Sequence, residues 1–324
     1  MGERAISLID DVDSVEESSI IASSVKTSCV FASFINSVLV NALDYDDTSQ
    51  ADHPGATIIP AALAVAEKIG SISGKELITA IILGYEICEK IGRAIQPSWI
   101  RYIKVHGMSH QTFGAVGAAS KLLKFDKWKF LNAIGLAGAF SPVPHAGKFG
   151  LDERPVVWIK NNVAWTSLAG VFAALLAEKG FIGSRSILDG DTGFWIMASS
   201  DKCGFDEMVK FEAYEILSVS FKTYPCCRWL HTTLDALRDI ILHENISVDD
   251  VKKVNVRTIA PLVEKFMDYD SRNMIDAQFS LPYAVAMILC RIPRLKWYSK
   301  EILFNDKIKN VMRLVKAEVD EDAN

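Results

Sequence analysis

The 324-residue sequence lacks the features that define several classes of protein. Its cysteines, at positions 29, 88, 203, 226, 227 and 290, form neither C-x-x-C pairs nor a disulfide framework. The longest apolar run, residues 164–177, is shorter than the roughly 18 to 20 residues that cross a bilayer. The first seventeen residues are acidic, whereas a secretory signal would begin with basic residues and continue with an apolar run. We therefore expect a cytoplasmic protein that does not span a membrane.

Positive charge is also scarce. The chain has 35 Lys and Arg against 40 Asp and Glu, which gives a formal net charge of −5, and no basic block is present. This balance argues against a protein that binds nucleic acid or an anionic membrane by neutralising phosphates. A small anionic substrate stays compatible with it, because a few local cations are enough to bind one.

Apolar residues, by contrast, are plentiful, at 50% of the chain, and the length favours about two domains. Helical spacing and end signals predict helices over residues 54–68, 73–94, 126–139 and 162–179. Ser73 and Glu76 form the pattern of a capping box.

The pattern changes after about residue 218. A helix around Leu234 is followed by an alternating strand pattern over residues 251–259, a helix over 281–290 and a strand over 314–319. We therefore predict a mainly α protein, with a large all-helical domain (residues 1–217) and a smaller α+β domain (residues 218–324).

The densest polar segment lies directly before a predicted helix. Within ten residues it carries four carboxylates and an imidazole: Asp44, Asp46, Asp47, Asp52 and His53. If buried, such a cluster cannot be fully ionised, so one carboxylate could act as an acid or base near neutrality. Two other interpretations stay open here, namely solvated loop and cap residues, or a divalent metal site.

Three further polar residues interrupt otherwise apolar or small-residue segments. His106 precedes a helix rich in Ala and Gly, Lys160 lies in the run Val156 to Trp165, and Lys222 lies in Phe221-Lys-Thr-Tyr-Pro225. A buried lysine commonly binds an anion, although each of these residues alone could equally be structural.

Taken together, these segments resemble the MmgE/PrpD family in order along nearly the whole chain. The resemblance rests on Asp44-Tyr-Asp-Asp-Thr48, His53-Pro-Gly55, Ser73 to Glu86, Ala118 to Leu123, Gly180-Phe-Ile-Gly183, Ile187-Leu-Asp-Gly190 and Phe221-Lys-Thr-Tyr-Pro225. It implies a homodimer in which a helical domain carries a smaller lid domain, and chemistry on small polycarboxylates without a cofactor or a metal.

The resemblance also implies site residues. Matching motif by motif gives the catalytic set Asp44, His53, His106, Lys222 and Tyr283, and the substrate-binding residues Thr48 and Lys160. His110 is the alternative to His106, because the spacing from the histidine to the following helix differs slightly from the family pattern. Lysines and a protonated imidazole would stabilise the negative charge that develops beside a substrate carboxylate.

The activity implied is that of a carbon–oxygen lyase that dehydrates a citrate-like hydroxy-tricarboxylate such as 2-methylcitrate. Decarboxylation of the cis-aconitate type and epimerisation of the iminodisuccinate type are the alternatives. Relative to the family pattern, we expect the chain to lack the opening helices and the end of the lid. A non-catalytic homologue or a binding partner is therefore the hypothesis of another class.

Overall fold

The computed structural model describes residues 2–12, 14–49, 52–105, 107–142, 152, 154–156 and 162–323. Internal contacts divide the chain into two compact units. Unit 1 comprises the described residues of 1–42, 46–146 and 159–221, and unit 2 those of 43–45, 147–158 and 222–324. The predicted domain division stays a prediction, as does the role of residues 218–324 as a lid.

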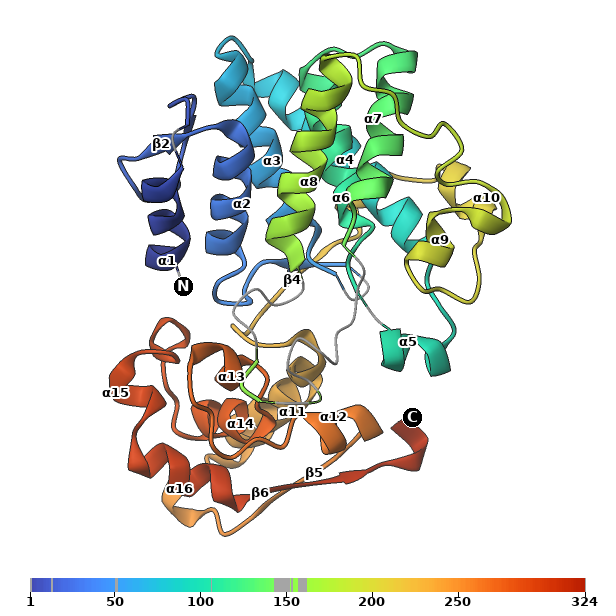
Figure 1. Cartoon of the computed structure of the whole chain (residues 1–324). Coiled ribbons are helices and arrows are strands. Elements are labelled where there is room, and N and C mark those ends of the chain that lie inside the picture. Colours follow the sequence, from blue (N-terminus) through green and yellow to red (C-terminus); the bar gives the residue numbers. More distant parts are fainter. Residues whose placement is uncertain are drawn as a thin grey trace. The chain divides into compact units, whose positions relative to one another are not determined.

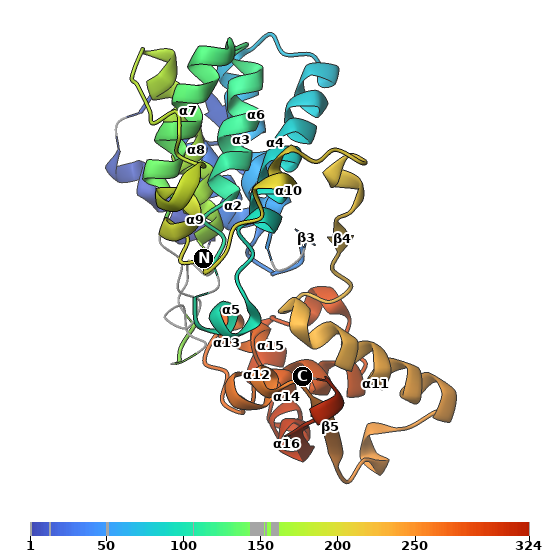
Figure 2. The same ribbon diagram turned by 90° about the vertical axis from the view of Figure 1, so that its right-hand side faces the viewer.

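Helices dominate unit 1, as predicted. Those that form its body are α2 (Cys29–Val40), α3 (Pro54–Ile69), α4 (Gly74–Ala94), α6 (Gln111–Leu122), α7 (Lys127–Phe140) and α8 (Val163–Glu178). Shorter helices are α1 (Gly2–Ser7), α5 (Trp99–Val105), α9 (Phe194–Met197) and α10 (Phe205–Val209). Figures 1 and 2 show α2, α3, α6, α7 and α8 side by side in this bundle.

Local sequence explains where the main helices begin. Ser73 and Glu76 form the capping box of α4, Asp126 accepts a hydrogen bond from the N–H of Lys129 at the start of α7, and Pro54 occupies the first turn of α3. All four helices predicted in the first part of the chain are confirmed within one or two residues.

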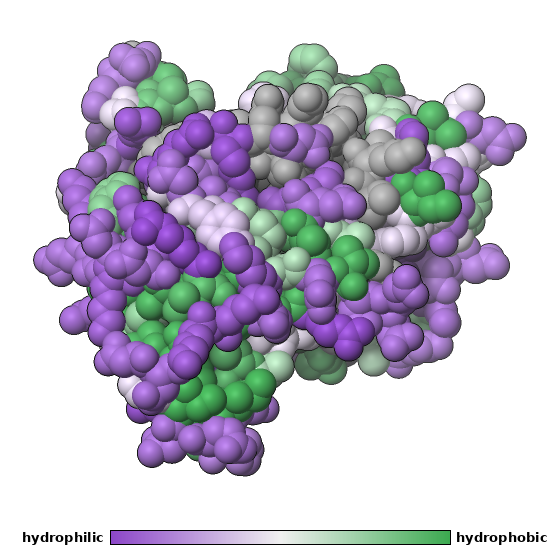
Figure 3. All heavy atoms as spheres, turned by 90° about the horizontal axis from the view of Figure 1, so that it is seen from below, coloured by the Kyte–Doolittle hydropathy of each residue, from purple (hydrophilic) through white to green (hydrophobic). Residues whose placement is uncertain are grey.

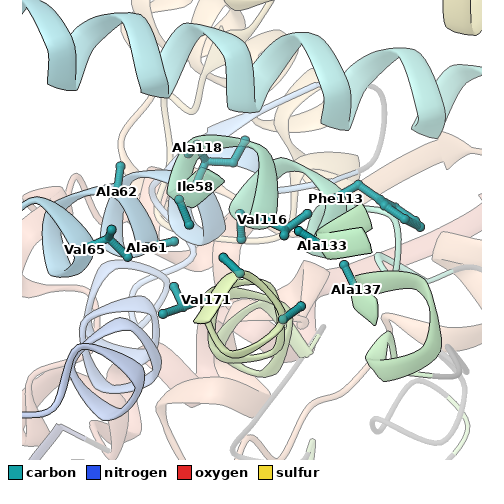
Figure 4. Packing of buried hydrophobic residues seen from close by; sticks show 14 of the residues in the cluster. Ile58, Ala61, Ala62, Val65, Phe113, Val116, Ala118, Ala133, Ala137 and Val171 are labelled. Carbon is teal, nitrogen blue, oxygen red and sulfur yellow. The ribbon is translucent and has the colours of Figure 1, made fainter. Parts of the chain in front are cut away.

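Helix α6 is the centre of unit 1. It packs against α3, α4, α7 and α8, and every one of its residues except Lys121 is buried. Small side chains allow this close packing, because Ala and Gly let neighbouring backbones approach. Figure 4 shows the resulting core, a single cluster to which Ile58 and Val65 of α3, Val116 of α6 and Val171 of α8 all belong.

Two short strand pairs interrupt the helical architecture of unit 1. Strand β1 (Ser18–Ser19) pairs with β2 (Lys26–Thr27), and β3 (Asp47–Thr48) pairs in antiparallel register with β4 (Ser220–Phe221). The second pair joins the acidic segment to a part of the chain far away in sequence. The sequence pattern did not predict this strand pair, because strands of two residues are too short to show an alternating pattern.

Unit 2 combines helices with one small sheet. Its helices are α11 (His231–Glu244), α12 (Ala260–Lys265), α13 (Met274–Gln278), α14 (Leu281–Leu289), α15 (Lys300–Leu303) and α16 (Asp306–Leu314). Strands β5 (Val254–Thr258) and β6 (Val315–Val319) form a parallel pair. The predicted helix over 281–290 and both predicted strands are thus confirmed, and the chain as a whole is mainly α.

Large aromatic side chains fill the core of unit 2. Trp297, Tyr224 and Tyr283 are almost completely buried, and the Tyr224 and Trp297 rings stack with centroids 6.1 Å apart. Apolar residues are also exposed: Leu295 is 86% and Leu242 66% accessible. The space-filling view in Figure 3 shows apolar patches bordered by hydrophilic residues. Among the described residues, no helix is both long and apolar enough to cross a membrane.

Candidate active site

The carboxylates of Asp46, Asp47 and Asp52, which belong to unit 1, are buried. The side chain of Asp46 is 3% exposed, and Asp47 and Asp52 are 9% and 4% exposed. These carboxylates are therefore not solvated loop residues, although Asp47 does cap the start of α3 by accepting the N–H of Gly55. The pairing of β3 with β4 and the packing of α3, α4 and α6 bury them, and neither effect can be read from local sequence.

Asp47 holds the start of α3. One of its oxygens accepts the N–H of Gly55 at 3.1 Å and the other accepts the hydroxyl of Tyr85 at 2.7 Å. A Cβ on Gly55 would lie 2.2 Å from the Asp47 oxygen, so only glycine fits at this point of the His-Pro-Gly motif. Burial raises the pKa of Asp47, and burial together with the neighbouring Asp47 charge raises the pKa of Tyr85.

His53 is fixed on both its backbone and its ring. Its Nδ1 lies 2.8 Å from the Asp46 carboxylate, which also accepts a hydrogen bond from Asn41 at 3.0 Å. The side-chain amide of Gln111 bonds the His53 backbone twice, accepting from its N–H and donating to its carbonyl. Because a carboxylate only accepts hydrogen bonds, the ring donates this bond through a proton on Nδ1.

His110 forms a second pair of the same kind. Its Nε2 lies 2.7 Å from Asp52 Oδ2, and both residues are buried. Thr48, predicted to bind substrate, donates its hydroxyl to the backbone carbonyl of Asp52 at 2.8 Å. Unit 1 thus contains two imidazoles, each bonded to a buried carboxylate, an arrangement that orients a histidine for proton transfer.

Unit 2 brings together two other predicted residues, which are 178 positions apart in the sequence. Lys222 Nζ lies 2.9 Å from Asp44 Oδ1 and donates to the Asp44 carbonyl at 3.2 Å, and both side chains are at most 2% exposed. Asp44 adopts the left-handed backbone conformation, with φ of 51°. Non-glycine residues in this conformation are uncommon and concentrate at functional sites.

Residues 224 and 225, which follow Lys222, contact the aromatic core of unit 2. Tyr224 stacks on Trp297, and the carbonyl of Pro225 accepts the hydroxyl of Tyr298. Tyr283, predicted to be catalytic, is 1% exposed and donates its hydroxyl to the carbonyl of Trp297. Burial raises the pKa of the Tyr283 phenol, which keeps it protonated near neutrality.

Two of the predicted residues, His106 and Lys160, lie outside the described residues. Sequence reasoning did not single out Gln111 or the pairing of Asp52 with His110. The signal available for both was the polar pair His110-Gln111 at the start of an otherwise small and apolar helix.

A buried group of side chains in unit 1 has the donor types of a metal site. Asp52, Cys88 and His110 each offer one atom within 4.8 Å of the others. However, Asp52 and His110 already bond each other, and a metal ion would have to replace this bond. We therefore assign no metal to this group.

Comparison with known proteins identifies the family of the chain. The model of the MmgE/PrpD N-terminal domain matches residues 2–205, and that of the C-terminal domain matches residues 224–324. The chain belongs to the MmgE/PrpD family. The expected resemblance is confirmed, and the two matches together cover most of the sequence.

The chain is similar in sequence to cis-aconitate decarboxylases. Human cis-aconitate decarboxylase is 26% identical over 222 residues, 66% of this chain and 44% of that protein. The cis-aconitate decarboxylase of Aspergillus terreus is 24% identical over 230 residues, 66% of this chain and 46% of that protein. A cis-aconitate decarboxylase-like protein of Aspergillus oryzae is 23% identical over 279 residues, 80% of this chain and 56% of that protein. The chain spans about half the length of these relatives.

Proposed function

We propose that this chain is a lyase that acts on a small polycarboxylate, with decarboxylation of a cis-aconitate-type substrate as the first candidate reaction. The observation that carries the proposal is the presence of two buried imidazole–carboxylate pairs, His53 with Asp46 and His110 with Asp52. The similarity to the human and Aspergillus terreus cis-aconitate decarboxylases supports the same reaction.

Decarboxylation makes two demands on a protein. The bond between the leaving carboxylate and its carbon breaks, carbon dioxide departs, and the electron pair delocalises toward a neighbouring unsaturated carboxylate. A proton must then reach the carbon, and cations must hold the remaining carboxylates. We assign the proton transfer to His53 and His110, and carboxylate binding to Lys222. Lys160 and Thr48 are kept as further substrate-binding residues on the strength of the family motifs.

Dehydration of a citrate-like substrate such as 2-methylcitrate is the second candidate. It requires an acid that protonates the departing hydroxyl group. Tyr283 was the residue predicted to act there, and its hydroxyl is already donated to the Trp297 carbonyl in the core of unit 2. Dehydration would therefore require an acid other than Tyr283. Epimerisation and the role of a non-catalytic binding partner follow as further alternatives.

The test is a substrate comparison with cis-aconitate, 2-methylcitrate, citrate and iminodisuccinate, followed by NMR and by carbon dioxide release. We expect carbon dioxide and an unsaturated dicarboxylate from cis-aconitate. His53→Gln and His110→Gln should each lower kcat by about a hundredfold or more. His243→Gln, an exposed histidine of α11, is the control and should leave turnover unchanged.

The alternatives predict other products. Water loss from 2-methylcitrate without carbon dioxide would identify a dehydratase, and turnover of no substrate would support the non-catalytic homologue. The homodimer also stays a prediction, and light scattering should report about twice the chain mass of 35.8 kDa.

A further inference from the structure

Glu89 of α4 is a buried acid that the reaction proposed above does not use. It is 2% exposed, and its Oε1 has no hydrogen-bond partner among the described residues. Its carboxyl group forms hydrogen bonds with the Ser49 side chain and with the thiol of the neighbouring Cys88. A buried carboxyl oxygen without a partner is costly, so its retention calls for an explanation.

The Asp52–His110 pair lies against the same turn of α4. Gly92 follows Glu89 by three residues, and a Cβ on Gly92 would lie 2.7 Å from His110 Nε2. The ring of His110 therefore rests directly on this turn, and only glycine leaves room for it. Asp52 Oδ1 is the second buried oxygen here that lacks a partner among the described residues.

The groups that face Glu89 are mostly acidic. Asp47 and Asp52 come from the segment before α3, and Glu215 comes from the short helix Glu215–Leu217. Arg93 of α4 also interacts with Glu89, but it is paired with Glu215. His110 is the titratable group at the start of α6. Burial, and next the Asp52 charge, raise the pKa of Glu89 to about 8.

We propose, on the basis of the function proposed above, that Glu89 is a positioning residue that stays protonated, so that Asp52 is the anion that orients His110. A protonated carboxyl group is a donor, and the oxygen of Asp52 without a partner is an acceptor in the same cluster. With Nε2 bonded to Asp52, Nδ1 is the nitrogen through which His110 exchanges its proton. Ionisation of Glu89 would place a second negative charge beside the pair and change the protonation of His110.

Enzyme kinetics against pH test this inference through Glu89→Gln, which imitates the protonated acid and cannot ionise. In the wild-type protein, kcat/KM should fall above about pH 8, approaching tenfold per pH unit. Glu89→Gln should keep its pH 7 activity and lose this alkaline fall. Glu178→Gln, at the exposed end of α8, is the matched control and should keep the wild-type profile.

NMR titration of His110 supplies a readout that does not depend on turnover. Its ring signals, assigned with His110→Gln, should show an inflection near pH 8 in the wild-type protein and none there in Glu89→Gln. That result without turnover of any substrate would refute the proposed function and leave the positioning role intact. Persistence of the inflection in Glu89→Gln would overturn the inference. Absence of the inflection in the wild-type protein would also overturn it, and that result does not depend on how well the variant folds.

Discussion

The two compact units keep buried ionisable groups in different states. In unit 1, Glu89 has no cation bonded to it among the described residues, and burial raises its pKa to about 8. In unit 2, burial lowers the pKa of His231 to about 4, and the neutral ring donates to the Cys226 carbonyl at 3.3 Å. Lys222 and Asp44 of unit 2 are also buried, but they form an ion pair at 2.9 Å.

The difference shows what burial demands of a charge. A titratable group without an opposite charge loses its charge on folding, whereas two opposite charges can be buried together if their geometry is good. Unit 1 therefore gains a proton on folding near neutral pH, through Glu89. Unit 2 contains a fixed ion pair, and that pair depends on both partners being present.

The largest loss of stability should come from Lys222→Met, which removes the cation of the buried ion pair. Removal of the amine leaves Asp44 buried without its cation, so the free energy of unfolding should fall by about 3 to 5 kcal/mol. Denaturant unfolding measures the loss. If Lys222 also binds substrate, kcat/KM of the folded fraction should drop about ten- to a hundredfold.

Two variants sharpen the comparison. The double variant Lys222→Met/Asp44→Asn should recover part of the lost stability, since asparagine tolerates the left-handed backbone at position 44.

Lys265→Met breaks the half-exposed ion pair of Lys265 with Asp152, whose N–O distance is also 2.9 Å, and should lower the free energy of unfolding by about 1 kcal/mol or less. Equal costs for the two lysines would show that burial of the Lys222 pair is irrelevant to stability.

Acid should destabilise unit 2 through His231. The unfolded imidazole takes up its proton near pH 6.5 and the folded one only near pH 4, so stability is complete above pH 6.5 and declines as pH falls to 4. The decline amounts to about 3 kcal/mol, at 1.36 kcal/mol per pKa unit. Thermal unfolding of His231→Gln across this range should show a shallower decline, and His243→Gln should match the wild type.

The close approach at Gly55 predicts a smaller loss. In Gly55→Ala the new methyl group would collide with the Asp47 carboxylate, and the shift needed should cost about 2 kcal/mol. Gly74→Ala provides the matched change in the first turn of α4, where a Cβ meets nothing within 4 Å. It should be neutral or stabilise by up to about 1 kcal/mol. Thermal unfolding measures both changes, and a melting temperature of Gly55→Ala as high as that of Gly74→Ala would contradict the prediction.

No effect at all is expected from removal of metal ions. The proton-transfer groups of unit 1 are histidines bonded to carboxylates, so turnover should survive exhaustive treatment with EDTA. Loss of activity on chelation, followed by recovery with one divalent ion, would contradict the assignment of no metal to Asp52, Cys88 and His110.

Local signals predicted most of the helices. The capping box at Ser73 and the aspartate cap at Asp126 act within four residues, so the sequence alone contains them. The contacts of the candidate site act over longer distances. Asp52 and His110 are 58 residues apart, and only the packing of α3, α4 and α6 makes them neighbours. The burial of Asp46, Asp47 and Asp52 has the same origin, which is why composition suggested a solvated loop instead.

The assignment of residues 43–45 to unit 2 has a practical consequence for dissecting the protein. A gene fragment that encodes only residues 222–324 would retain the amine of Lys222 and omit the aspartate that neutralises it. Such a fragment should aggregate or remain partly unfolded on expression. Supplying a peptide that contains Asp44 in trans, or grafting it through a circular permutation, would be the minimum needed to obtain unit 2 as a separate reagent.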